Sequence, residues 1–260
     1  MNKYLNIALI QSHITWENPV QNQKVLEEKI RAVDSKTDLI VLPEMFSTGF
    51  TMNAAEVAES MDGTTVKWLQ KLAKEKKAAI TGSIIIKEKS SYYNRLVFAS
   101  PDQMLQQYDK HHLFTMAREN EIFTAGSKEV IINYKGWKIK PQICYDLRFP
   151  VWSRNKTEYD MLLYVASWPK PRIHAWDTLL QARAIENMSY CIGVNRVGLD
   201  GMGYEYNGHS AVYDVLGHRI TNSENLEKES IFYAELEKAH IEKTRQKLPF
   251  LKDADTFKLL

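Results

Sequence analysis

The 260-residue chain lacks the features that define several large classes of protein. It has only two cysteines, Cys144 and Cys191, which excludes a disulfide framework and a four-cysteine metal site. It has no apolar run long enough to cross a bilayer, and its first residues lack the apolar core and the small-residue cleavage site of a signal peptide. We therefore expect a cytoplasmic protein without a membrane partner.

The chain also has little net charge. Its 34 lysines and arginines against 32 aspartates and glutamates give a formal charge of +2, which does not favour nucleic acid as a partner. The densest basic run, Lys74 to Lys77, is interrupted by Glu75. Eleven glycines and eight prolines leave no room for a long low-complexity segment. Because no linker, repeat or break in composition divides the chain, we expect one domain over residues 1–260.

Short apolar runs bounded by turn residues predict many strands. Several of these runs are apolar throughout, as in strands buried on both faces, whereas the middle of the chain has hairpin-like turns. Strands are expected at 5–10, 38–42, 78–86, 93–99, 104–108, 130–134, 137–144, 161–165, 191–194, 211–215 and 231–235. Helical patterns lie between them, so the alternation predicts an α/β layered sandwich.

Two of the expected helices have clear signals. Asn18 is a good N-cap and Pro19 suits the first helical position, so a helix should begin there. A later helix is expected over residues 173–188. Its inner face is predicted to carry Leu179, Ala182 and Ile185.

Cys144 is the strongest candidate for a nucleophile. It ends an expected strand and precedes a polar turn, where a thiol is exposed and the following backbone N–H groups can hold an oxyanion. Cys191 lies within an apolar run and is typical of a small buried side chain. A Cys–His pairing of Cys144 with His209 or His174 is an alternative that the chain order permits.

Two charged residues also follow expected strands. Glu44 comes after an apolar run and a proline, at the strand end where α/β folds usually place working residues, although a cap or a salt bridge would fit as well. Lys110 follows the strand at 104–108. The adjacent His111 and His112 have no third ligand at a suitable spacing, so we predict no metal site.

Together, three segments resemble the nitrilase (carbon–nitrogen hydrolase) superfamily. They are residues 42–44 (Leu-Pro-Glu), 109–114 (Asp-Lys-His-His-Leu-Phe) and 143–150 (Ile-Cys-Tyr-Asp-Leu-Arg-Phe-Pro), in the order of the superfamily's motifs. Residues 181–187, 193–198 and 208–210 resemble its later segments. The resemblance therefore covers nearly the whole chain.

This resemblance implies a fold and a catalytic set. The fold would be a four-layer α-β-β-α sandwich that forms a homodimer through a helical layer, with no metal or organic cofactor. The catalytic residues would be Glu44, Lys110 and Cys144. A second glutamate before the nucleophile would be Glu119, although Glu121 is close enough to be an alternative.

The resemblance also implies a mechanism and a substrate class. Residues 43–52 and 61–63 look most like the bacterial omega-amidase branch, which hydrolyses the terminal amide of short 2-oxo acids such as 2-oxoglutaramate. Cys144 would attack the amide carbon, Glu44 would transfer protons, and Lys110 with the backbone N–H of Tyr145 would hold the oxyanion.

An oxo-acid substrate needs a cation for its carboxylate, ideally an arginine. Arg172 is the candidate for this role, and Trp168 is expected to form a wall of the pocket. Arg148 is expected to pack structurally near the nucleophile.

Other functions fit the same segments. A carbamoyl-amine hydrolase or a general aliphatic amidase of the superfamily would use the same residues on another small-molecule amide, and a true nitrilase matches the motif surroundings less well. A catalytically silent scaffold is the alternative from a different class. The complete set Glu44, Lys110 and Cys144 argues against it.

Overall fold

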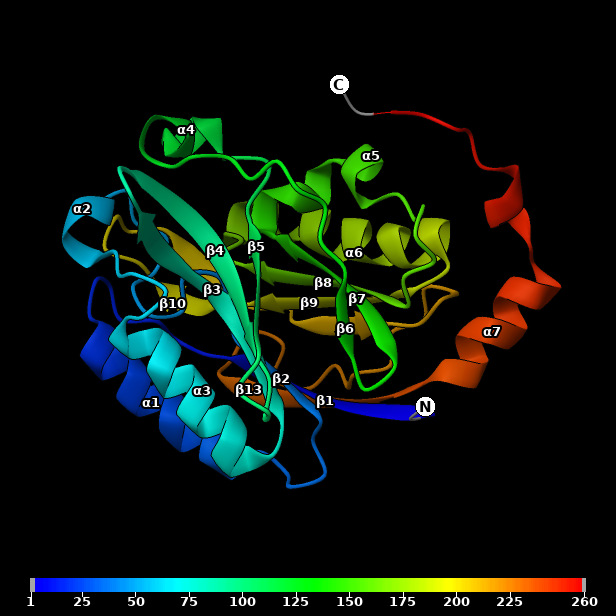
Figure 1. Ribbon diagram of the computed structural model, residues 1–260, viewed down its shortest axis with the longest axis horizontal. Helices are drawn as coiled ribbons and strands as arrows, with labels where there is room; N and C mark the ends of the chain where they lie inside the picture. Colours follow the sequence, from blue (N-terminus) through cyan, green and yellow to red (C-terminus); the bar gives the residue numbers. More distant parts are fainter. Residues whose placement is uncertain (1–2, 259–260) are drawn as a thin grey trace.

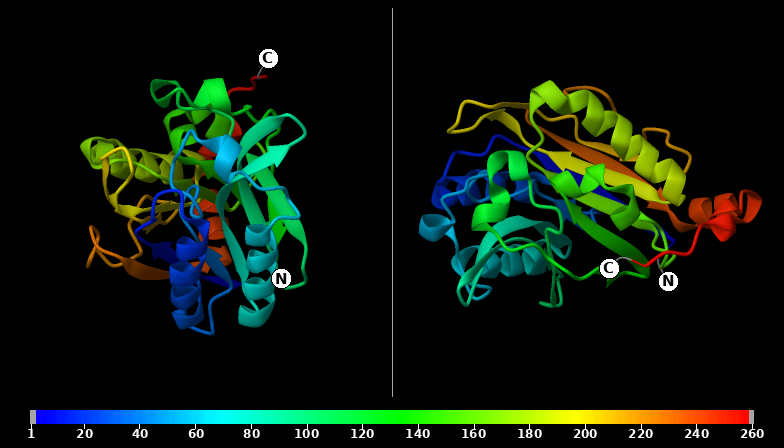
Figure 2. Two further views of the ribbon diagram at one scale, coloured as in Figure 1. Left: turned by 90° about the vertical axis from the view of Figure 1, so that its left-hand side faces the viewer. Right: turned by 90° about the horizontal axis from the view of Figure 1, so that it is seen from above.

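The computed structural model describes residues 3–258 and has four layers. Two β-sheets face each other, and helices cover the outer face of each (Figures 1 and 2). The prediction of an α-β-β-α sandwich is therefore confirmed. No helix within residues 3–258 is long and apolar enough to cross a membrane.

The first sheet has six strands in the order β13-β1-β2-β3-β4-β5. Strands β1, β2 and β3 are parallel to one another, and each of the other pairs is antiparallel. The bounds are β1 Tyr4–Gln11, β2 Leu39–Val41, β3 Ala79–Glu88, β4 Ser91–Ala99, β5 Leu105–Asp109 and β13 Ser230–Glu237. The helices α1 (Pro19–Ala32) and α3 (Thr64–Lys76) cover its outer face (Figure 1).

The second sheet has five strands in the order β12-β9-β8-β7-β6, of which β7, β8 and β9 are parallel. The bounds are β6 Ile132–Tyr134, β7 Trp137–Ile143, β8 Met161–Ala166, β9 Tyr190–Asn195 and β12 Ala211–Tyr213. The helices α5 (Pro150–Ser153) and α6 (Ile173–Asn187) lie on its outer face. Strands β10 (Val197–Leu199) and β11 (Glu205–Asn207) form a separate two-stranded ribbon.

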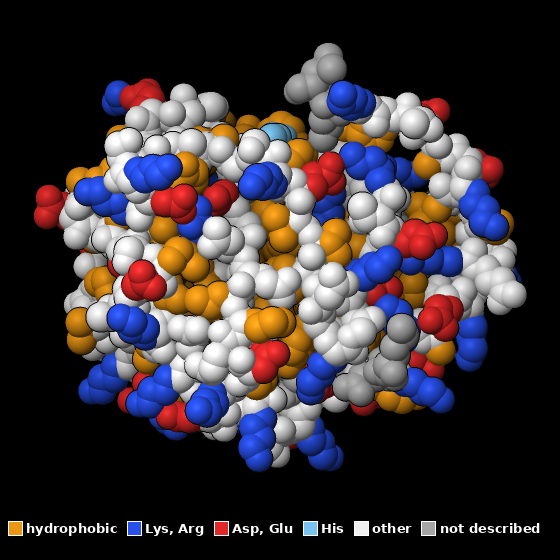
Figure 3. Space-filling model, in the orientation of Figure 1, with side chains coloured by type: hydrophobic (Ala, Val, Ile, Leu, Met, Phe, Trp, Pro, Cys, Tyr) orange, Lys and Arg blue, Asp and Glu red, His pale blue; other side chains and the backbone are white. Residues whose placement is uncertain are grey.

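Shorter helical segments join these elements. They are α2 (Ala54–Val57), α4 (Glu119–Ile122) and the 3₁₀ turns η1 (Thr115–Ala117), η2 (Cys144–Arg148) and η3 (Lys170–Arg172). After β13, α7 (Lys238–Lys247) and η4 (Phe250–Asp253) lie at the edge of the sandwich, on the right in Figure 1. On the face seen in Figure 3, basic and acidic side chains are interspersed.

Strand β1 shows why the apolar runs lack alternation. Its side chains point alternately to the two faces of the sheet. Leu5, Ile7 and Leu9 pack into the core between the two sheets. Ala8 and Ile10 pack instead against the layer of α1 and α3. Because both faces of the strand are covered, nearly every position in it is apolar.

The start of α1 is as predicted. The side-chain oxygen of Asn18 accepts a hydrogen bond of 3.1 Å from the N–H of Gln21, and Pro19 is the first helical residue.

The predicted inner face of α6 is wrong at two of its three residues. Leu179 is half-buried and packs against the core, but Ala182 is half-buried outside it and Ile185 is 45% exposed. The face that packs on the sheet instead carries Trp176, Leu180, Arg183, Ala184 and Asn187.

A glycine on the sheet explains this orientation of α6. A Cβ atom at Gly193 of β9 would lie 2.4 Å from the Leu180 side chain and 2.7 Å from that of Trp176. The absence of a side chain at Gly193 therefore allows the bulky side of α6 to approach the strand. Hydrophobicity alone does not predict this choice of face, because the buried face also contains Arg183 and Asn187.

Candidate active site

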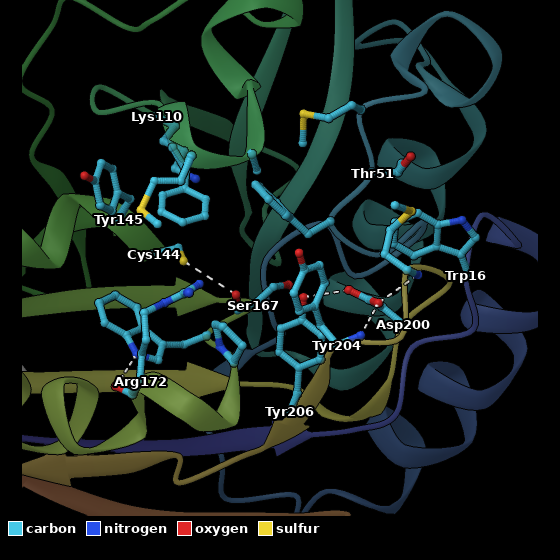
Figure 4. Close-up of a pocket in the computed structure, with 18 of the residues that line it drawn as sticks. Trp16, Thr51, Lys110, Cys144, Tyr145, Ser167, Arg172, Asp200, Tyr204 and Tyr206 are labelled. Atoms are coloured by element: carbon cyan, nitrogen blue, oxygen red, sulfur yellow. Dashed lines mark hydrogen bonds between the residues drawn. The ribbon is translucent and has the colours of Figure 1, made fainter.

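The ends of four strands meet at one end of the sandwich. Glu44 follows β2, Lys110 follows β5, Cys144 follows β7 and Ser167 follows β8, so the two sheets contribute equally. Lys110, Cys144 and Ser167 line a cavity of about 510 Å³ (Figure 4). Glu44 does not line the cavity, but it contacts Lys110 and Ser167. The walls of the cavity include Trp16, Phe50, Met52, Phe114, Met116, Tyr145, Arg148, Trp168, Arg172, Met202, Tyr204 and Tyr206.

Cys144 occupies a sharp turn between β7 and η2. Its φ is +45°, a left-handed conformation that residues other than glycine rarely adopt and that often marks functional positions. The thiol lies in the cavity wall, with Sγ 3.8 Å from the carbonyl oxygen of Ser167. The buried Asp146 holds the turn, because its carboxylate accepts hydrogen bonds from the N–H of Ile143 (3.0 Å) and from the hydroxyl of Tyr108 (2.8 Å).

Glu44 and Lys110 form a completely buried ion pair. The ammonium of Lys110 donates to Oε1 of Glu44 at 2.9 Å, and both side chains have no exposed surface. The second oxygen of Glu44 accepts a hydrogen bond of 2.8 Å from the N–H of Ser167. Since Ser167 also lies against the Cys144 sulfur, the carboxylate and the thiol share one neighbour.

The structure distinguishes the two candidates for the second glutamate. Glu119 is buried, and its carboxylate oxygens accept hydrogen bonds from Lys110 at 2.9 and 3.1 Å. The N–H of Phe114 donates to the same carboxylate at 2.6 Å. Glu121 lies at the surface and pairs with Arg118. Of the two glutamates, only Glu119 contacts Lys110.

The charges of this cluster shift its pKa values. Burial by itself lowers the pKa of Lys110, but the carboxylates of Glu119 and Glu44 more than reverse this effect, so the ammonium stays protonated. Burial raises the pKa of Glu119, with Lys110 opposing the rise and Glu44 adding to it. Burial also raises the pKa of the Cys144 thiol, and Glu44 adds to this rise. The surroundings of Cys144 therefore favour the protonated thiol over the thiolate.

The histidines have other partners. His111 stacks on Trp152 with ring centroids 3.6 Å apart, and Nδ1 of His112 lies 2.8 Å from Asp146. His209 pairs with Asp177, and neither His209 nor His174 lines the cavity of Cys144. The Cys–His alternative is therefore wrong. Within residues 3–258, no group of three His, Cys, Asp or Glu side chains is arranged to hold a metal ion.

Trp168, Arg172 and Arg148 all line the cavity. The indole N–H of Trp168 donates to the carbonyl of Arg172 at 2.8 Å. The guanidinium of Arg172 lies over the ring of Phe114, and that of Arg148 lies over the ring of Trp168, at 5.2 and 4.9 Å from the ring centroids. Arg148 packs near the nucleophile, as expected, and in addition the turn of η2 places it in the cavity wall.

Comparison with known proteins agrees with this arrangement. The profile described as "Carbon-nitrogen hydrolase" matches residues 6–246. The chain belongs to this family. It is 42% identical over 255 residues to the omega-amidase YafV of Escherichia coli strain K12, with 98% of each protein covered. It is 33% identical over 252 residues to the 2-oxoglutaramate amidase of Bacillus subtilis strain 168, covering 95% of this chain and 96% of that protein.

A solved carbon–nitrogen hydrolase has nearly the same structure. XC1258 from Xanthomonas campestris, described as a superfamily member with an arsenic adduct in its active site, has a TM-score of 0.96 to this chain. The two are 40% identical, and all of both chains is covered. The predicted superfamily and fold are thus confirmed, and the chain is an enzyme that hydrolyses carbon–nitrogen bonds of amides.

Sequence reasoning missed two residues of this carbon–nitrogen hydrolase site. Asn94 of β4 donates its side-chain amide to both Glu44 and Glu119. Ser167 contacts the Glu44 carboxylate and the Cys144 sulfur through its backbone, and its hydroxyl donates only a 3.4 Å hydrogen bond to the Glu44 carbonyl, so its side-chain type gives little signal. The one available signal for Asn94 was a polar residue within a strand whose second half is apolar.

Proposed function

We propose that the chain is a cysteine-dependent omega-amidase that hydrolyses the terminal amide of a short 2-oxo acid, such as 2-oxoglutaramate, through a thioester on Cys144. The observation that carries the chemistry is the buried group of Glu44, Lys110 and Glu119 beside a thiol in a strained turn. The relatives named above as omega-amidase and 2-oxoglutaramate amidase support the substrate class.

In the first half of the reaction, the Cys144 sulfur attacks the amide carbon while Glu44 accepts the thiol proton. A carbon–sulfur bond forms, and the carbonyl oxygen becomes an oxyanion. Glu44 then returns the proton to the amide nitrogen, the carbon–nitrogen bond breaks and ammonia leaves. The acyl group remains as a thioester on Cys144.

In the second half, Glu44 takes a proton from a water molecule that attacks the thioester carbon. The carbon–sulfur bond breaks, the carboxylic acid leaves, and the proton returns to Cys144. The free enzyme is thereby restored with no cofactor consumed.

Lys110 is suited to hold the oxyanion in both halves. Its ammonium has three N–H groups, and its contacts go to one oxygen of Glu44 and to both oxygens of Glu119. When one N–H group spans the two Glu119 oxygens, a third remains for the substrate. The backbone N–H of Tyr145, the residue after the nucleophile, supplies a second donor. Loss of one such donor costs roughly 100- to 1,000-fold in rate.

Arg172 and Arg148 supply the positive charge that a 2-oxo acid needs. Both guanidinium groups rest on aromatic faces, which hold them without using their N–H donors. Within residues 3–258, neither side chain forms an ion pair with a carboxylate, so both are available to a substrate carboxylate. An uncharged amide would leave these two charges unmatched.

We also propose that two copies pair through the layer of α6. Ile185 on α6 and Val151 on α5 are 45% and 48% exposed, and Leu216, in the loop after β12, is 42% exposed. A Cβ atom at Gly217 would lie 2.6 Å from the Ile185 side chain, so Leu216 is close to that helix. Apolar side chains gathered on one outer layer are typical of an interface between subunits.

The decisive experiment follows ammonia release from 2-oxoglutaramate by the wild-type protein and by Cys144→Ala. We expect release by the wild type and none by the variant, with a mass shift of one acyl group on Cys144 in rapidly quenched wild-type samples. Faster release from neutral aliphatic amides or carbamoyl amines than from 2-oxoglutaramate would refute the substrate assignment. Equal release by Cys144→Ala would refute the mechanism.

A further inference from the structure

Asn94 contacts both carboxylates of the buried cluster. It lies on β4, is 1% exposed, and does not line the substrate cavity. Its side-chain Nδ2 donates to Oε1 of Glu44 at 2.8 Å and to Oε1 of Glu119 at 3.3 Å. The same two oxygens also accept from Lys110, so the amide closes a ring of donors and acceptors with the ammonium.

We propose that Asn94 is a positioning residue that bridges Glu44 and Glu119 and keeps them ionised, so that Glu44 is able to accept the proton of Cys144. This inference rests on the proposed cysteine mechanism. It assigns to Asn94 no contact with the substrate.

The need for such a residue follows from the charges. Two buried carboxylates share one ammonium, and like charges at close range tend to be relieved by uptake of a proton that the pair then shares. A protonated Glu44 could not act as the base. Hydrogen bonds to an ionised carboxylate favour that form, and Asn94 provides them to both glutamates without adding charge.

The direction of the amide is determined by its neighbours. If the group were turned over, its oxygen would face two carboxylate oxygens, which would repel it. In the observed direction the oxygen is buried and has no hydrogen-bond partner within residues 3–258. The site therefore holds the amide for its N–H donors, at the cost of leaving its acceptor unpaired.

The backbone of Asn94 is held as well. Asn94 pairs with Ile85 in the ladder between β3 and β4, and its carbonyl accepts a hydrogen bond of 3.0 Å from the N–H of Lys110. One residue thus supports Lys110 through the backbone and both glutamates through the side chain. The titratable groups that face the cluster are Glu44 after β2, Lys110 after β5, Glu119 of α4, Cys144 after β7 and, at longer range, Tyr206 of β11.

The test is the pH dependence of kcat/KM for 2-oxoglutaramate in the wild type, Asn94→Leu and Asn94→Asp. Leucine has nearly the same shape as asparagine but no donor. For Asn94→Leu we expect the acid limb of the kcat/KM profile to move to higher pH by about one unit or more. Activity should recover as the pH rises, and KM should change little. Asn94→Asp adds a carboxylate to the cluster, so its limb should move further.

A matched control separates this role from a purely structural one. Asn187 is also buried, and its side chain bonds only to groups around the end of α6, such as the N–H of Asn155 and the carbonyl of Arg183. Asn187→Leu should lower the melting temperature without moving the acid limb. If Asn94→Leu lowers activity by the same factor at every pH, or leaves the profile unchanged, the inference is overturned.

A second readout does not depend on the substrate assignment. The rate at which iodoacetamide modifies Cys144, followed by mass spectrometry of its peptide, should show the same shift of the acid limb in Asn94→Leu. If the wild type does not hydrolyse 2-oxoglutaramate, the proposed function fails, but the alkylation profile still decides the role of Asn94. Superimposable alkylation profiles would overturn it.

Discussion

Replacing Lys110 by methionine tests how much the structure depends on one buried charge. The side chains have similar lengths, but Lys110→Met leaves Glu44 and Glu119 buried with no cation. Removing one partner of a buried ion pair typically costs about 3–5 kcal/mol, because the remaining charge is uncompensated. For a chain of this size, 1 kcal/mol changes the melting temperature by about 2–4 °C, so we expect a decrease of roughly 6–20 °C at pH 7.

The decrease in melting temperature of Lys110→Met should be larger at high pH than at low pH. Burial already raises the pKa of Glu119, and loss of the ammonium raises it further. A carboxyl group whose folded-state pKa exceeds its unfolded-state value contributes stability at low pH and loses it as the pH rises through the folded-state pKa. The melting temperatures of the variant and the wild type should therefore differ least near pH 5 and most near pH 8.

A suitable control for this experiment is Lys140→Met. Lys140 is also buried, but it pairs with the partly exposed Glu129, which water can solvate when the lysine is lost. Its loss should cost less than that of Lys110 and should change little between pH 5 and 8. Scanning calorimetry of both variants across that range measures the difference. A Lys110→Met protein as stable as the wild type at pH 7, or a decrease independent of pH, would refute the reasoning.

Three further predictions concern the cavity, the second cysteine and the outer helix. Arg172→Met should reduce kcat/KM for 2-oxoglutaramate by about 10- to 100-fold, mainly through KM, because a charged hydrogen bond contributes about 1.5–3 kcal/mol. An equal reduction for a neutral amide would contradict a role of Arg172 in carboxylate binding. Burial raises the pKa of the Cys191 thiol, so Cys191→Ala should retain ammonia release and the alkylation of Cys144. Loss of ammonia release with Cys144 still alkylated would show instead that Cys191 takes part in the reaction. Ile185→Glu should halve the mass measured by light scattering if α6 is the interface, and an unchanged mass would exclude this face.

The sequence was most informative about the strand ends. Glu44, Lys110 and Cys144 each lie at or just after the end of an expected strand, and the structure places them within one site because β2, β5 and β7 end at the same end of the sandwich. The local sequence pattern was sufficient to locate these residues, because the end of a strand is marked by a few consecutive residues.

Predictions of which side of a helix is buried, or of where a loop residue points, were less accurate. Ala182 and Ile185 were misassigned to the inner face of α6, whereas Trp176 and Leu180 approach the sheet at Gly193, a residue of another element. Arg148 follows the nucleophile by only four residues, yet the turn of η2, and not its distance along the chain, sends it into the cavity. Each of these outcomes depends on a residue or a turn outside the local pattern.

By itself the sequence determined the layered α/β class, the family and the three charged or nucleophilic residues, because apolar patterning and short motifs are local properties. Only the tertiary structure decided which of Glu119 and Glu121 contacts Lys110, and only it revealed Asn94 between two carboxylates. Those facts depend on side chains from separate strands and loops meeting in a buried site. There, distances of a few ångströms and the exclusion of water determine how strongly the charges interact.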